Sequence, residues 1–275
     1  MLVTRTNVAS MEAQRNLTRS HEALSKSFNR LSSGYRINSA ADDASGLAIS
    51  ESLTGQVRSF TVAERNANDA ISMVQTAEAS VGEMSNIMHR MRELAVQGSN
   101  GTLTAQDRGY LDTEFQALKS ELGRIQESSK FNGKQLVGTT ASTVTFQVGL
   151  NNTASDQLQV TFGGLALTAM LAATSTLTGA TAGNAQNMLG RIDATLTSLS
   201  TARSNYGATM NRLEVATSAI STMRLNMSAA NSRIRHVDVA EEPSMMARNQ
   251  VLTQAGVSVL SQANQLPNMA MNLLG

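Results

Sequence analysis

Few residues of this chain are of types that perform chemistry, and their spacing does not favour a catalytic site. The three histidines, at positions 21, 89 and 236, are far apart, and none stands in a His-Glu-x-x-His pattern. The sequence has no cysteine, which excludes thiolate metal sites and cysteine nucleophiles. No glycine-rich phosphate loop follows a strand pattern, and no serine lies in a nucleophile elbow. We therefore expect no enzyme activity, no metal and no cofactor.

The adjacent carboxylates of Asp42 and Asp43 suggest a metal hypothesis. A cation bound by carboxylates needs further oxygen ligands, and no third ligand stands nearby in the sequence. Aspartate before a helical pattern instead accepts hydrogen bonds from the free N–H groups of the first turn. We predict that this pair caps a helix or forms a surface pair.

Apolar residues recur every seven positions in two long stretches, which is typical of helices that pack along a seam. In residues 47–98 the line includes Leu53, Phe60, Val74 and Val81. In residues 185–234 it includes Ile192, Leu199, Leu213 and Ile220. Fifty helical residues extend about 75 Å, so each helix needs a partner of similar length. We predict a mainly α fold, an elongated antiparallel rod or coiled coil with these residues along its packing seam.

The sequence between the two stretches predicts smaller elements. A capping-box pattern at Thr104 starts a third helix over about 104–128. Residues 143–162 change to a period of two, which predicts a β-hairpin. Residues 165–183 are rich in Ala, Thr, Leu and Gly, and we expect them to form a mostly exposed connection.

The two ends of the chain carry narrower heptad lines. Near the N-terminus the line contains Leu17, Leu24 and Leu31, and near the C-terminus it contains Leu252, Val259, Leu266 and Leu273. A helix with so thin an apolar stripe is marginally stable alone. We predict that these terminal helices pair with each other, and that their exposed ribbons associate with further copies of the chain.

Composition limits the classes of partner. The formal net charge is +1, which argues against bulk attraction to nucleic acid or to membranes. No apolar run approaches the length of a membrane span, and the first residues do not form a cleavable secretory signal. We expect neither a nucleic acid nor a membrane partner.

The sequence contains the motifs RLSSG at residues 30–34, RINSAADDA at 36–44, NAND at 66–69, MRELAVQ at 91–97, FNG at 131–133, NSRI at 231–234 and QAGVSVLSQANQ at 254–265. These motifs resemble those of the bacterial flagellins. The resemblance covers both terminal thirds of the chain. Pro243, inside what is usually an uninterrupted helix, and Gly275, where a basic residue is common, depart from the family pattern.

The resemblance implies a structural subunit that self-assembles into the extracellular flagellar filament for swimming. Residues 1–44 and 236–275 would form the coiled-coil lining of the filament core, and residues 45–235 would form the rod domain. The assembly residues of the core would be those of the two terminal heptad lines, Leu17, Leu24, Leu31, Leu252, Val259, Leu266 and Leu273. The subunit would be secreted unfolded through the flagellar export apparatus with an export chaperone. Its other partners would be further copies of itself and the hook-filament junction and cap proteins.

The resemblance also implies recognition by an innate immune receptor of animals. Arg90, Leu94 and Glu114 match the family motif, whereas Met88 and His89 depart from the residues usual there. The alternative role of Arg90 and Glu114 is packing between the rods of neighbouring subunits.

Three other hypotheses remain open from the sequence. A hook-filament junction protein shares the terminal pattern of the flagellins. An amphipathic protein of membrane surfaces would need Lys/Arg-rich polar faces and interfacial aromatic residues, and the chain is 3% aromatic. A catalytic protein would need a site formed between subunits.

Overall fold

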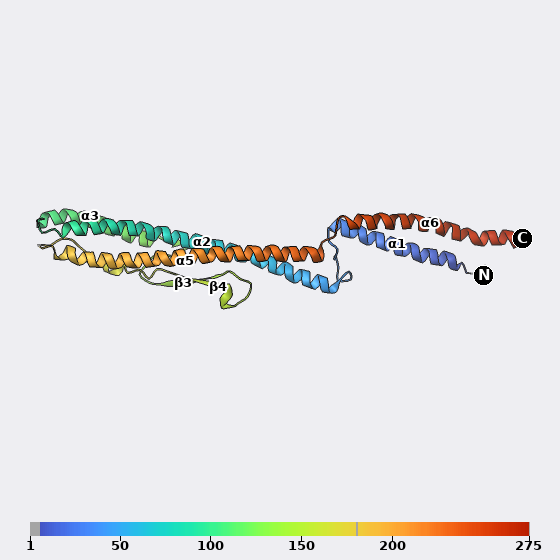
Figure 1. Cartoon of the computed structure of the whole chain (residues 1–275), viewed down its shortest axis with the longest axis horizontal. Coiled ribbons are helices and arrows are strands. Elements are labelled where there is room, and N and C mark those ends of the chain that lie inside the picture. Colours follow the sequence, from blue (N-terminus) through green and yellow to red (C-terminus); the bar gives the residue numbers. More distant parts are fainter. Residues whose placement is uncertain (1–5, 180, 275) are drawn as a thin grey trace. The chain divides into compact units, whose positions relative to one another are not determined.

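The computed structural model describes the backbone of residues 6–179 and 181–274, and the side chains of the same residues as far as 265. This part of the chain is mainly helical with small β-hairpins, which confirms the predicted fold class (Figure 1). The helices are α1 (Val8–Ser33), α2 (Ala44–Gly98), α3 (Ala105–Ser128), α4 (Thr168–Leu171), α5 (Gly183–Arg235) and α6 (Glu241–Leu274). The strands are β1 (Lys130–Phe131), β2 (Lys134–Gln135), β3 (Ser142–Gln147) and β4 (Gln157–Phe162), with the short 3-10 helix η1 (Ala154–Asp156) before β4.

The chain divides into two compact units. Unit 1 contains Met1–Val57 and Leu225–Gly275, and unit 2 contains Arg58–Arg224. The division falls inside α2 and α5. The domain boundaries expected from the family resemblance, after residues 44 and 235, instead coincide with the start of α2 and the end of α5. That domain assignment therefore stays a prediction.

In unit 2, α2 and α5 lie side by side in opposite directions (Figure 1). Their register is marked by three ion pairs, Arg92–Asp193, Glu78–Arg203 and Glu64–Arg224, in which the residue number rises along one helix and falls along the other. These side chains are at least partly exposed, so each pair contributes little to stability and serves mainly to favour this alignment.

The predicted seam residues lie on the inner faces of these helices. Leu53 is half-buried, Phe60 and Ile220 are 5% exposed, and Val74, Val81, Ile192, Leu199 and Leu213 are fully buried. Methionine contributes heavily to the same core, with Met84, Met88 and Met91 also fully buried. Because thioether chains adapt to irregular gaps, they fill the space where further elements join the helix pair.

Helix α3 and the β3–β4 hairpin also pack on the helix pair of unit 2, with α3 along α2 and the hairpin beside α5 (Figure 1). Helix α3 begins at a capping box, in which Thr104 and Asp107 bond each other's backbone N–H groups, and it buries Phe115 and Leu122. Strand β4 places Leu158, Val160 and Phe162 in the same core. The period-two pattern therefore correctly predicted the hairpin.

The expectation of an exposed connection over residues 165–183 is wrong. Leu165, Leu167, Met170 and Leu177 are each no more than 4% exposed and belong to the unit 2 core. Ser175 is also fully buried, and its hydroxyl donates to the carbonyl of Ala169. The segment thus packs over the helices as a covering layer.

Polar side chains of α3 hold this covering segment by its backbone. Asp112 accepts from the N–H of Leu177 at 2.7 Å. Gln116 and Lys119 donate to the carbonyls of Ser175 and Ala172, at 2.8 and 2.6 Å. A helical pattern alone assigns these residues to a solvated face, which is why the sequence did not reveal the contact.

Candidate functional site

The described residues do not assemble a metal or catalytic cluster. No group of three His, Cys, Asp or Glu residues lies together among them. Asp43 accepts from the N–H of Gly46 at 2.8 Å and so caps α2, as predicted. Asp42 pairs with Lys26 at 2.8 Å. This ion pair, aided by the backbone N–H groups of Ser39 and Asn38, holds the pKa of Asp42 well below its usual range.

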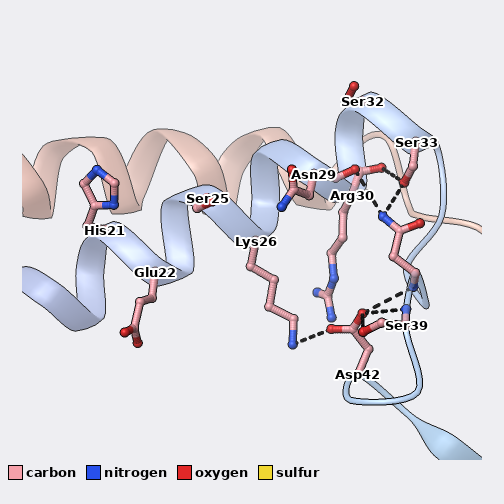
Figure 2. A pocket seen from close by; sticks show the side chains of 11 residues that line it. His21, Glu22, Ser25, Lys26, Asn29, Arg30, Ser32, Ser33, Ser39 and Asp42 are labelled. Atoms are coloured by element: carbon pink, nitrogen blue, oxygen red, sulfur yellow. Dashed lines mark hydrogen bonds and ion pairs between the residues drawn. The ribbon is translucent and has the colours of Figure 1, made fainter.

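Asp42 borders an open polar hollow at the C-terminal end of α1. Figure 2 shows Lys26 pointing from the helix toward Asp42, while the carboxylate also meets the backbone of the Ser39 turn. Asn38 reaches back to the hydroxyl of Ser33. One side of the hollow is thus a tightly bonded turn, in which Lys26 and Asp42 pair with each other.

A paired contact joins the segment after α1 to the segment after α5, both in unit 1. Tyr35 and His236 form an antiparallel bridge, and their rings lie 5.4 Å apart. The guanidinium of Arg235 lies 4.6 Å over the Tyr35 ring. Arg36 donates to the carbonyl of Ile234 at 2.6 Å. These bonds join the segment that follows α1 to the segment that leads into α6.

Helices α1 and α6 then run side by side (Figure 1). The α1 face that meets α6 includes small polar residues, since Ser10 and Ser27 are buried there and Ser10 donates to Asn264 at 2.7 Å. The predicted residues Leu17, Leu24 and Leu31 are half-buried on the same helix.

The α6 face that meets α1 includes small residues at two of its positions. A Cβ added at Gly256 would lie 3.2 Å from Leu17, so the two helices approach closely at this point. Two helical turns further along α6, Ala263 is 6% exposed, and its backbone carbonyl accepts a hydrogen bond from the Asn7 side chain at 2.9 Å. At the other end of the pair, Arg30 lies 3.7 Å from the buried Glu242.

Several of the larger apolar residues of this helix pair are exposed rather than buried in the contact. Leu252 and Val259, two of the predicted assembly residues, are 47% and 55% exposed. Other exposed apolar side chains on the pair are Val8, Met11, Phe28, Met245, Val251 and Val257. Leu266 and Leu273, the other two predicted C-terminal residues, lie among residues whose side chains are outside the described part. The pair therefore presents an apolar outer surface, here called the outer ribbon.

The predicted contact residues on α2 and α3 divide into two groups. Arg90 and Glu114 are half-exposed and bonded to each other at 2.8 Å, and Arg90 also pairs with Glu93. These carboxylates raise the pKa of Arg90. Leu94 is only 1% exposed in the subunit, so its assignment as a contact residue stays a prediction. Leu94 lies on the same helix as Arg90, but its side chain faces the core.

No described helix is long and apolar enough to cross a membrane.

Comparison with known proteins agrees with the motifs. The model of the bacterial flagellin N-terminal helical region matches residues 5–142, and that of the C-terminal helical region matches residues 189–274. A flagellin of Halalkalibacterium halodurans is 41% identical over 268 residues, covering 98% of each chain. The flagellin FlaB1 of Treponema pallidum is 34% identical over 282 residues, again covering 98% of each.

Among solved structures, a putative flagellar hook-associated protein from Vibrio parahaemolyticus matches with a TM-score of 0.59 at 16% identity. It covers 71% of this chain and 100% of that one, which shows a shared fold. The two family models together span most of the sequence, at both ends, and the relatives match over nearly their whole length. The chain therefore belongs to the bacterial flagellin family, the structural subunits of the extracellular flagellar filament.

Proposed function

We propose that this flagellin self-assembles into the filament through the outer ribbon of α1 and α6. The observation that carries the proposal is the set of large apolar side chains that this helix pair leaves exposed. Small residues such as Ser10, Gly256 and Ala263 lie in the contact, while Leu252 and Val259 lie outside it. A helix pair stabilised mainly for its own sake would bury its large residues, so this distribution favours burial against other subunits.

The paired chain segments at Tyr35 and His236 support the same role. They fix the end of α1 and the start of α6 in unit 1, so that the two halves of the outer ribbon are presented together. Under this proposal residues 1–44 and 236–275 form the filament core, and residues 45–235 form the surrounding rod domain. Leu17, Leu24 and Leu31 would then contribute their exposed halves to the same core.

The route to the filament is part of the proposal. The chain would pass unfolded through the flagellar export apparatus, with a chaperone covering the apolar face of α6 before assembly. The absence of cysteine is compatible with this route, because no disulfide can form before the chain has left the cell. Hook-filament junction and cap proteins would bound the polymer at its two ends.

Arg90 and Glu114 favour a second contact surface, on unit 2. Their ion pair is exposed and lies off the buried seam, so its loss costs the fold little. We assign it to packing between neighbouring rods in the filament, and in the free subunit to recognition by an innate immune receptor.

Salt-induced assembly of the purified monomer, followed by sedimentation and electron microscopy, tests the main proposal. The Val259→Thr variant keeps the shape of the side chain but replaces one of its methyl groups on the outer ribbon by a hydroxyl. We expect its critical concentration to rise about tenfold for each 1.4 kcal/mol of lost contact, while monomer circular dichroism stays unchanged.

Val215→Thr is the matched control, since Val215 is a helical valine of unit 2 that is 71% exposed. Its critical concentration should change much less. Equal loss of assembly in both variants, or normal assembly of Val259→Thr, would show that the outer ribbon is not the main assembly surface. Purified native filaments that contained this chain at their base alone would instead favour the junction-protein hypothesis.

A further inference from the structure

The chain contains two Asn-Gly dipeptides in different backbone environments. Asn100-Gly101 lies in the loop between α2 and α3, and Asn132-Gly133 lies in the turn between β1 and β2. All four residues are exposed. Glycine has no Cβ to shield its backbone nitrogen, so that nitrogen is able to attack the side-chain amide of the preceding asparagine. The two dipeptides share this chemistry, and their local geometry decides whether it proceeds.

The geometry of Asn132 opposes the attack. Its φ is 48° and that of Gly133 is 78°, and the flanking residues Phe131 and Lys134 are paired across the hairpin. Positive φ at both central residues is the type I′ turn of two-residue hairpins. In that turn the Gly133 nitrogen lies on the opposite side of the Cα–C bond from the Asn132 side chain. Bringing them together would require rotation of the backbone and loss of the strand pairing.

The geometry of Asn100 favours the attack. Its side-chain Oδ1 accepts from the N–H of Thr102 at 3.1 Å, which closes an Asx turn. An Asx turn folds the side-chain amide back toward the following peptide unit, so we infer that it brings Cγ of Asn100 toward the nitrogen of Gly101. The same hydrogen bond withdraws electron density from the amide carbonyl, as donors to a developing oxyanion do.

We propose that Asn100 is a site of spontaneous deamidation in the folded protein and that the hairpin turn protects Asn132. The Gly101 nitrogen forms a bond to Cγ of Asn100, and the Cγ–N bond of the side-chain amide breaks. The nitrogen leaves as ammonia with the proton released from Gly101, which gives a cyclic succinimide. Water then opens either carbonyl of the ring to give aspartate or isoaspartate. No oxidant or reductant takes part.

The modification has a structural consequence because Asn100 adjoins a buried cation. Arg108 is 3% exposed, and its guanidinium donates to the carbonyls of Gly98, Asn100 and Gly179. Either product places a carboxylate in the loop that contains one of these acceptors. Isoaspartate also adds one carbon to the main chain at that point. Deamidation therefore alters the bonds that tie the start of α3 to the loop and to the segment before α5.

Peptide mapping of the folded monomer after prolonged incubation in mildly alkaline buffer tests the proposal. Heavy-oxygen water labels each deamidated residue, and isoaspartyl methyltransferase reports the isoaspartate product. We expect Asn100 to convert about tenfold or more faster than Asn132, because displacement from an attacking geometry greatly slows a reaction. Equal rates, or faster conversion of Asn132, would overturn the proposal.

Two controls separate the folded geometry from the dipeptide chemistry. In concentrated urea the two asparagines should convert at similar rates, since the Asx turn and the hairpin are both lost. A large difference that persisted in urea would show that the fold is not its cause. Gly101→Ala is the second control. Gly101 has open space where a Cβ would lie and has no left-handed φ, so the fold should tolerate alanine while conversion at Asn100 falls severalfold. An unchanged rate in that variant would refute attack by this nitrogen.

Discussion

Replacing Leu213 by alanine provides a strong test of the unit 2 core, because α5 offers a matched control. Leu213 is fully buried, whereas Leu225, twelve positions later on the same helix, is 70% exposed. Both substitutions remove the same atoms from a helix and leave a good helix former. Leu213→Ala should cost about 2–5 kcal/mol, since it creates a cavity among residues that relax only partly. Leu225→Ala should change stability by less than about 0.5 kcal/mol.

Thermal unfolding of the monomer measures the difference. For a unit of this size each kcal/mol shifts Tm by roughly 2–4 °C, so Leu213→Ala should melt roughly 4–20 °C lower than the unaltered chain. Near-ultraviolet circular dichroism reports unit 2 directly, because Tyr206 is 2% exposed and its ring lies 5.8 Å from that of Phe162. If both variants lost similar stability, or if Leu213→Ala melted normally, the inner face of α5 would have been assigned incorrectly.

Two further predictions concern charge and backbone conformation. Lys26→Met should raise the pKa of Asp42 toward its ordinary value, because the Lys26 ion pair is the largest cause of its depression. The stability contributed by ionised Asp42 is present above the ordinary carboxyl range and is lost as pH falls through the lowered folded pKa, so acid unfolding of the variant should begin at higher pH. Carboxyl NMR titration measures the pKa, and acid unfolding measures the stability. An unmoved Asp42 titration would contradict the assignment. Gly163 has φ of 72°, and a Cβ there would lie 2.4 Å from the carbonyl oxygen of Thr140, so Gly163→Ala should destabilise unit 2 by about 1–3 kcal/mol. Gly207→Ala, in open space within α5, should stabilise it by about 0.5–1 kcal/mol, and melting curves in which both variants moved in the same direction would contradict this contrast.

The sequence predicted the regular parts of the fold well, for a physical reason. Leu199 and Leu213 stand on a line of period seven, and a helix must place such a line on one face. Strand β4 alternates with period two for the same kind of reason. The start of α3 was also predictable, because Thr104 and Asp107 stand at the spacing that a capping box requires.

The covering segment was not predictable because it does not depend on a repeating pattern. Its short chain around Ser175 is held through backbone carbonyls and N–H groups, which every sequence possesses. The side chains that bind it, Asp112, Gln116 and Lys119, have the spacing of a solvated helix face. Leu94 shows the related limit of a motif, since a motif groups residues by position along the chain and does not state which of them face outward.

The apolar line on α6 raises a different question, because its period was visible but its partner was not. Within unit 1, α1 covers the line of Gly256 and Ala263 and leaves Leu252 and Val259 exposed. Ordering a residue costs about 1–2 kcal/mol of backbone entropy. Burial of apolar surface offsets this cost by about 25 cal/mol per Å², and small side chains bury little apolar surface. The helix pair alone therefore gains little from its own contact. Further stabilisation has to come from burying the outer ribbon, and a neighbouring subunit with the same unmatched surface is the partner that the proposed filament supplies. On this account the ordering of the terminal helices and the growth of the polymer are thermodynamically linked, so a change that weakens one must weaken the other.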